Sequence, residues 1–176
     1  HCNKSMNKKS SQQGFTLIEL LLYVGIAAVM LLVTSLFIST LLESRIKNQT
    51  VAEVEQQGLQ VMQLITQTAR NAEAITSPAL GASASSLTLD VITVGSDPTI
   101  FDLANGAFQM KEGAASAVSI TNSRVTASAL TFQNLSRTGT PGTIRIQFTL
   151  THVNPSVRNE YNFAKTFTAS ATLRQP

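Results

Sequence analysis

The residue whose type and position most suggest chemistry is Glu19, a carboxylate inside an apolar stretch. It lies in GFTLIELL, residues 14–21, and the next charged residue is Glu43. An ionised acid costs about 2.5–3.5 kcal/mol at the centre of a membrane-spanning helix and less near the end. On a helix, Glu19 lies roughly 6 Å from Phe15. If neighbouring chains later exclude water from it, the carboxylate needs a positive partner. The position of this acid therefore needs an explanation.

The residues after Phe15 offer little for catalysis or metal binding. They include one histidine, His152, and no cysteine, which leaves no histidine pair, cysteine nucleophile or multi-histidine metal cluster. We predict that His152 is a structural residue of a strand. The segments GASAS (81–85) and GTPG (139–142) are predicted to be a spacer and a turn. Four acids without calcium-loop spacing are predicted to be solvated surface residues: Asp90, Asp97, Asp102 and Glu112. The sequence thus predicts no enzyme, no cofactor and no metal.

The positive charge of the chain is confined to its first residues. The formal net charge is +3, and Lys4, Lys8 and Lys9 account for all of it, because the ten Lys and Arg after Phe15 balance ten Asp and Glu. The basic residues beyond Phe15 are scattered singly. A nucleic-acid backbone needs a basic patch, so the composition provides no direct evidence for nucleic-acid binding.

A membrane-spanning segment follows the lysines. Sixteen of the twenty residues from Leu20 to Ser39 are apolar, and twenty helical residues cover roughly 30 Å, the thickness of the hydrocarbon core. The bias of positive charge toward the cytoplasm predicts an inner N-terminus and an outer C-terminal part. Cleavage as a secretory signal at Gly25–Ala27 would leave a strongly apolar end, so we discount it. A plain uncleaved anchor remains the alternative.

The motif GFTLIELL, preceded by Lys8 and Lys9, resembles the processing site of type IV pilins and pseudopilins. The resemblance implies that a prepilin peptidase cuts after Gly14, removes a leader of residues 1–14 and methylates the new amino group of Phe15. It also implies that Glu19 pairs with the Phe15 amino group of a neighbouring subunit. Since Met6 would give a leader of ordinary length, residues 1–5 are expected to precede the natural start. TQTARNAEAITSP (66–78) and LTFQNLS (130–136) are loosely similar to minor pilins and J-type pseudopilins.

The helical pattern extends well past the span. No proline interrupts the chain between Phe15 and Pro78, so we predict one helix over about 15–77, with a transmembrane part at about 15–42 and an amphipathic second half. Small or apolar residues recur there at spacings of three and four, which is typical of one buried face. This predicted stripe comprises Val51, Val54, Gly58, Val61, Ile65, Thr68, Ala72 and Ile75. A coiled-coil seam is the competing interpretation, disfavoured by the small residues in the stripe.

Residues 78–176 are predicted to form a β-sheet head. Period-two alternation marks strands near 87–91, 143–150 and 161–173, with the last two joined by a loop near Asn154 and Pro155. Asn105-Gly106 predicts a tight hairpin, and two or three short strands are expected around Asn122 and Ser123. A helix followed by a run of strands indicates an α+β fold, with the amphipathic half of the helix on an antiparallel sheet.

Together these features predict a structural, minor subunit of a type IV pilus-like filament or secretion pseudopilus. Its expected partners are prepilin peptidase, other pilins or pseudopilins, and membrane lipid through residues 15–42. Its expected location is the cytoplasmic membrane, with the head outside the cytoplasm, and then the filament. The alternative is a single-pass membrane-anchored adhesion or binding protein that does not assemble into a filament. The system that such a subunit serves could be adhesion, DNA uptake, motility or secretion.

Overall fold

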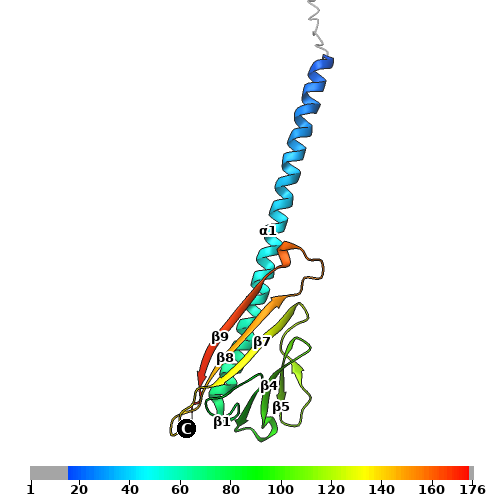
Figure 1. Cartoon of the computed structure of the whole chain (residues 1–176). Helices are drawn as coiled ribbons and strands as arrows, with labels where there is room; N and C mark the ends of the chain where they lie inside the picture. The colour runs from blue at the N-terminus through cyan, green and yellow to red at the C-terminus, as the bar shows by residue number, and fades with distance from the viewer. Residues whose placement is uncertain (1–15, 175–176) are drawn as a thin grey trace, which may run out of the picture. The chain divides into compact units, whose positions relative to one another are not determined.

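A computed structural model describes residues 16–174, which divide into two compact units within residues 1–42 and 43–176. Helix α1, Leu17–Asn71, passes through the division (Figure 1). In the first unit, α1 is apolar and exposed; in the second, its C-terminal half packs against antiparallel strands. The predicted α+β fold, with one long helix and antiparallel strands, is confirmed.

Helix α1 ends earlier than predicted. The expected end near residue 77 is wrong, because strand β1, Ala72–Ser77, begins directly after Asn71. β1 pairs with β3, Leu87–Val91, with Ala72 opposite Val91. This pairing extends from Ala72 to Ser77 with two register shifts, and the backbone groups that it satisfies outweigh the helix propensity of the alanines in the segment. One free carbonyl at the helix end, that of Arg70, accepts a hydrogen bond from the backbone N–H of Arg174 at 3.0 Å.

The buried stripe of α1 differs from the predicted one at its ends. Ala72 and Ile75 belong to β1, and Val51 and Thr68 are only half-buried. The central members of the predicted stripe, from Val54 to Ile65, are buried as expected. The complete set of buried helix residues is Thr50, Val54, Gly58, Val61, Ile65 and Ala69. The helix thus buries one narrow face, as an amphipathic helix on the side of a domain does.

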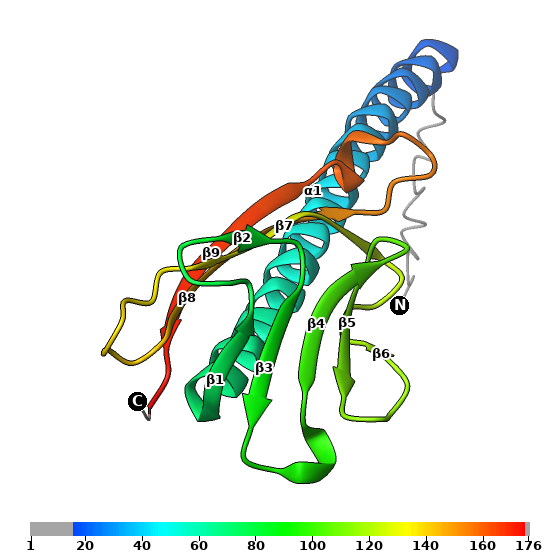
Figure 2. The same ribbon diagram turned by 60° about the horizontal axis from the view of Figure 1, so that its bottom comes forward.

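One of the two sheets has five strands in the order β1-β3-β4-β5-β6 (Figure 2). Besides β1 and β3 it contains β4 (Thr99–Ala104), β5 (Ala107–Glu112) and β6 (Val118–Ser119). The predicted hairpin at Asn105-Gly106 is confirmed, because these two residues connect β4 to β5 with φ of 54° and 75°. Positive φ at both central residues is the requirement of the tight hairpin turn that Asn-Gly favours. A short 3-10 helix, η1 (Val94–Ser96), lies between β3 and β4.

The other sheet has four strands in the order β2-β7-β8-β9, so the strands form two sheets rather than the single sheet expected. β7 is Val125–Asn134, and the predicted long hairpin near the C-terminus is formed by β8 (Thr143–His152) and β9 (Ala164–Thr172). The predicted spacer at 81–85 is corrected in part, since β2, Ser83–Ala84, pairs with β7. Tyr161, expected in the last strand, lies in the 3-10 helix η2, Asn159–Tyr161.

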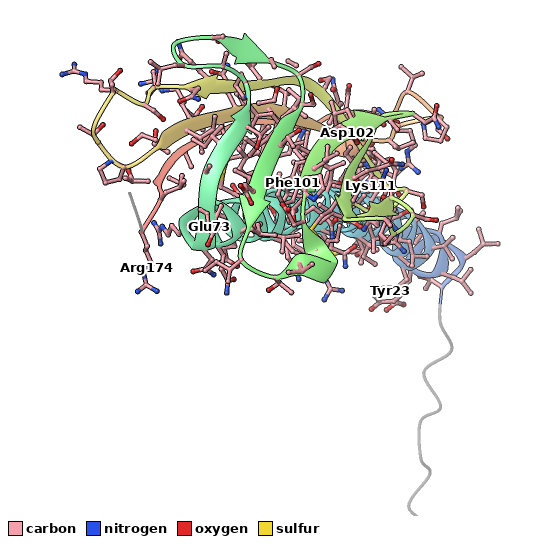
Figure 3. All side chains as sticks on the ribbon, turned by 90° about the horizontal axis from the view of Figure 1, so that it is seen from below. Tyr23, Glu73, Phe101, Asp102, Lys111 and Arg174 are labelled. Carbon is pink, nitrogen blue, oxygen red and sulfur yellow. The ribbon has the colours of Figure 1, made fainter. Side chains whose placement is uncertain are left out.

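Both sheets contribute to the core against which α1 packs. β7, β8 and β9 run alongside the C-terminal half of α1 (Figure 1). Phe101 of β4 lies among the side chains between the strands and the helix (Figure 3). Phe108 of β5 meets Phe148 of β8 edge to face at 5.2 Å, and Phe148 stacks on Phe167 of β9 at 5.4 Å. These three aromatic rings connect the two sheets through one apolar cluster.

Gly58 allows α1 to approach β9 closely. A Cβ atom at this position would overlap the outer edge of the Phe167 ring, which is itself buried and stacked on Phe148. The ring fills the space that a side chain at position 58 would need. Gly58 was predicted as a stripe member from its spacing, and the contact explains why a large apolar residue is not used there.

We predict that Gly58→Ala lowers the free energy of unfolding of the full chain in detergent by about 1–2 kcal/mol. Overpacking costs about 1–3 kcal/mol, and the upper part of this range, about 2–3 kcal/mol, applies because the added Cβ would overlap the ring; Ala for Gly in a helix returns about 1 kcal/mol. Denaturant unfolding followed by circular dichroism measures the difference. In a Phe167→Leu background the ring is absent, so the same substitution should become neutral or stabilising. An equal loss in both backgrounds would contradict the assigned contact.

Candidate functional site

The start of α1 contains the one predicted site residue that the structure describes, Glu19. Thr16 lies immediately before the helix, and its Oγ1 accepts a hydrogen bond from the backbone N–H of Glu19 at 3.4 Å. Thr16 and Glu19 therefore have the Thr-to-Glu spacing of a capping box, and the structure shows one of its two bonds, from the Glu19 N–H to Thr16. A negative charge in the first turn also complements the helix dipole. Glu19 thus has a role within its own chain.

Tyr23 is a second partner of the carboxylate that the sequence analysis missed. Its hydroxyl donates a hydrogen bond to Oε1 of Glu19 at 3.5 Å, from one helical turn further along. The signal was available in the sequence, because residues four apart lie side by side on a helix. Glu19 is half-buried, whereas its neighbours Leu17 and Leu20 are 80% and 59% exposed. The acid is the covered group on an otherwise exposed apolar turn.

The other predicted site residues, Gly14 and Phe15, lie outside the described residues, as does the leader 1–14. Cleavage after Gly14, methylation of Phe15 and assembly through Glu19 therefore stay predictions. The structure does describe the helical surroundings of Glu19. Its backbone N–H donates a hydrogen bond to Thr16, and its carboxylate accepts one from Tyr23. Only the bond from Tyr23 uses the carboxylate, so the carboxylate oxygens can accept further hydrogen bonds.

Helix α1 carries a continuous apolar surface from Leu17 to Leu42. Its large apolar side chains there are 48–80% exposed. By length and composition, α1 is the helix among residues 16–174 that could cross a membrane. Two hydroxyls in this stretch bond back to the helix, since Thr34 donates to the Met30 carbonyl at 2.6 Å and Thr40 to the Phe37 carbonyl at 2.8 Å. Such internal bonds suit a segment surrounded by hydrocarbon.

Comparison with known proteins assigns a family signature to this segment. Residues 9–35 match the family model of the prokaryotic N-terminal methylation motif, which is the signature of type IV pilins and pseudopilins. The predicted resemblance is therefore confirmed for the beginning of the chain, which carries a type IV pilin-like or pseudopilin motif. No curated protein and no solved structure matches the chain.

A polar cluster around Glu53 lies in the second unit. Glu53, on α1, accepts a hydrogen bond from Nδ2 of Asn122 at 3.0 Å. The carboxylate also lies 3.6 Å from Nη1 of Arg124 and 3.6 Å from Nε2 of His152. The His152 side chain is 10% exposed and stacks on Tyr161 at 5.6 Å. Glu53 thus connects the helix to the segment between β6 and β7 and to the end of β8.

The predicted surface acids are distributed over the five-stranded sheet and its loops. Asp90 and Asp102 are half-buried on β3 and β4, and Asp97 and Glu112 are exposed. Asp97 has a structural function, because its Oδ1 accepts a hydrogen bond from the Val91 N–H at 3.3 Å across the turn after β3. Within residues 16–174, no group of three or more His, Cys, Asp or Glu side chains could hold a metal ion.

We predict that Glu53→Ala destabilises the second unit by about 1–3 kcal/mol, the typical cost of removing a charged hydrogen-bond partner from a covered site. Glu55→Ala provides the matched control two residues along the same helix. Its carboxylate pairs with Lys165 at 2.6 Å, but both side chains are 43% exposed, so the expected loss is about 0–1 kcal/mol. Denaturant unfolding of both variants compares the two losses. Equal losses would show that the Glu53 cluster contributes no more than a surface pair.

Proposed function

We propose that this protein is a structural, minor subunit of a type IV pilus-like filament or secretion pseudopilus. The observation that carries the proposal is the match of residues 9–35 to the methylation motif. Two features of the described chain support it: an acid in the first turn of α1, and an apolar surface that continues to Leu42. The loose similarity of residues 66–78 and 130–136 to minor pilins and J-type pseudopilins favours a minor subunit.

In the proposed pathway the chain is inserted as a precursor, with its short N-terminus in the cytoplasm and residues 43–174 outside. Prepilin peptidase removes the leader 1–14 and methylates Phe15. Until assembly, lipid covers residues 15–42; during assembly, the helices of other pilins or pseudopilins replace the lipid. The protein performs no catalysis itself, which agrees with the usual structural role of proteins that carry this motif.

The proposed assembly step is the pairing of Glu19 with the Phe15 amino group of a neighbouring subunit. When helices pack and exclude lipid and water, a carboxylate and an ammonium that meet avoid the cost of two unpaired charges. Because Glu19 lies in the first turn of α1 and Phe15 is four residues before it in the sequence, the pair would also fix the axial position of one subunit against the next. This is a registry role, for which buried polar groups are best attested.

Gly14→Val should block processing, since bulk beside the scissile bond prevents the peptidase from closing on it. Mass spectrometry of the protein from cells that have the peptidase measures the result. The unmodified sequence should yield a mature N-terminus at methylated Phe15, and the variant should retain its leader. Removal of the leader from the variant would contradict the cleavage assignment, and an intact leader on the unmodified chain would favour the anchored binding protein.

Three variants at the helix start separate the two roles of Glu19. Glu19→Ala should lower incorporation into sheared filaments at least about tenfold, because a buried charge without its partner costs about 3–5 kcal/mol. Glu19→Gln removes the charge but retains capping ability, as Gln serves in a capping box as Glu does. Thr16→Ala removes the cap and retains the charge. Quantitative immunoblots of filament and membrane fractions report incorporation.

If charge pairing drives assembly, Glu19→Gln will be as defective as Glu19→Ala, and Thr16→Ala will be much less affected. Processing and membrane insertion should be unchanged in all three, as tested by leader removal and by co-fractionation with membranes. Normal incorporation of Glu19→Gln together with a defect in Thr16→Ala would show that the acid acts only through the helix start. That result would refute the proposed pairing.

A further inference from the structure

The end of α1 and the end of β9 meet at one end of the second unit. The backbone N–H of Arg174 donates to the carbonyl of Arg70 at 3.0 Å, and the N–H of Leu173 donates to the carbonyl of Gly142 at 2.8 Å. Gly142 is the last residue of the loop between β7 and β8, which also contains Arg137. Figure 1 shows the C-terminus beside this loop, near the end of the helix. The fold thus gathers three arginines that are far apart in the sequence.

These three arginines have no acidic partner among the residues that the structure describes. The ion pairs of the second unit use other basic residues. Residues 113–176 contain six Lys and Arg but a single acid, Glu160, which is already paired with Arg158. A basic residue in the last turn complements the helix dipole, which accounts for Arg70 but not for Arg137 or Arg174. Positive charge is therefore left uncompensated at this end of the unit.

Two of the arginines line one hollow of about 490 Å³. Its lining comprises Gln63, Thr66, Gln67, Arg70, Asn71 and Arg174. The Thr66 hydroxyl donates back to helix carbonyls, whereas the three amide side chains make no hydrogen bond within the described chain. Glu73, the acid nearest to Arg70 along the chain, is not part of the lining. The Arg174 side chain extends from the margin of the unit into open space (Figure 3).

The free groups of this hollow are hydrogen-bond donors, and two of them are charged. A guanidinium matches anionic oxygens with two parallel hydrogen bonds, so one arginine is enough for a carboxylate. A phosphate group carries up to two negative charges and three acceptor oxygens, so it can use two guanidiniums and neutral amide donors together. The donor set therefore favours phosphate over carboxylate.

We propose that this hollow binds a phosphate group through Arg70 and Arg174, with the amides of Gln63, Gln67 and Asn71 as neutral donors. A small phosphorylated molecule and the backbone of a nucleic acid present the same oxygens, and either can supply the group. The basic residues stand singly in the sequence, so the site becomes visible only when the fold joins the ends of α1 and β9. The site belongs to the second unit alone, and it does not depend on filament assembly.

Arg45 provides a matched control on the same helix. Its side chain is exposed, and it forms no ion pair with the residues that the structure describes. It lies roughly 37 Å from Arg70 along α1. Replacing Arg45 changes the net charge as much as replacing Arg70 does, but it leaves the hollow intact.

The test titrates the full chain in a neutral detergent with inorganic phosphate, followed by isothermal titration calorimetry. We expect Arg70→Gln combined with Arg174→Gln to weaken binding at least about tenfold, because hydrogen bonds between charged groups are the strong ones. Arg45→Gln should leave the affinity unchanged. Arg70→Lys combined with Arg174→Lys keeps the charge but loses the paired geometry, so it should also weaken binding several-fold. Circular dichroism melts check that each variant is folded.

Two further ligands identify the group and its source. Acetate at equal ionic strength should bind several-fold more weakly than phosphate. A short oligothymidylate that binds more tightly than inorganic phosphate, with the same dependence on both arginines, would assign the phosphate to a nucleic acid. Weaker binding of the oligothymidylate would assign it to a small molecule. Lys4, Lys8 and Lys9 are present in every variant, so they contribute equally to each measurement.

Several results would overturn the proposal. One is an unchanged affinity for phosphate in the double glutamine variant. Equal weakening by Arg45→Gln, or full affinity in the double lysine variant, would show a diffuse attraction to net charge rather than a site. Acetate that binds as tightly as phosphate would refute the assignment of phosphate.

Discussion

The exposed apolar surface of α1 between Leu17 and Leu42 is the constraint on which the rest of this protein depends. Side chains of this kind lose roughly 25 cal/mol of stabilisation for each Å² left in water, so a surface this long requires cover. No other part of the described chain covers this segment, because its large apolar side chains are all at least 48% exposed. In the proposed function, lipid in the membrane and sister helices in a filament provide the same apolar surroundings, so one surface would serve both states.

The second half of α1 solves a different packing problem with the same helix. It buries a single stripe, from Thr50 to Ala69, and its exposed residues are mostly polar, with Leu59 as an exception. Two sheets complete the core, connected by Phe108, Phe148 and Phe167. The sequence contains a single cysteine, so no internal disulfide can form and side-chain packing must hold this unit together. Gly58 contributes to this packing, because it lets the helix lie close to the Phe167 ring.

Features set by local sequence could be predicted, and features set by distant pairing could not. Asn105-Gly106 has a backbone preference that determines its hairpin, and alternation determined β3, β8 and most of β9. The end of α1 was misplaced because β1 forms only when β3 is available beside it. Strand β2 and the Glu53 cluster likewise join segments that are about 50–100 residues apart, for which one sequence contains no local signal. Tyr23 differs, because its helical spacing to Glu19 was visible.

The surroundings of Glu19 bear on how, in the proposed function, a subunit carries an acid in its membrane segment before assembly. Tyr23 supplies a contact to the carboxylate within the chain, which lowers its cost near the bilayer edge, whereas Thr16 accepts a bond from the Glu19 backbone N–H. The Tyr23 bond is long, at 3.5 Å, and hydrogen bonds of that length are weak. In the proposed assembly step, a charged amine from a neighbouring subunit would form a shorter and stronger bond, so it would displace the tyrosine hydroxyl without a large loss. Under that proposal, the same carboxylate is tolerable in the waiting subunit and more strongly bound in the filament, and this difference would favour assembly.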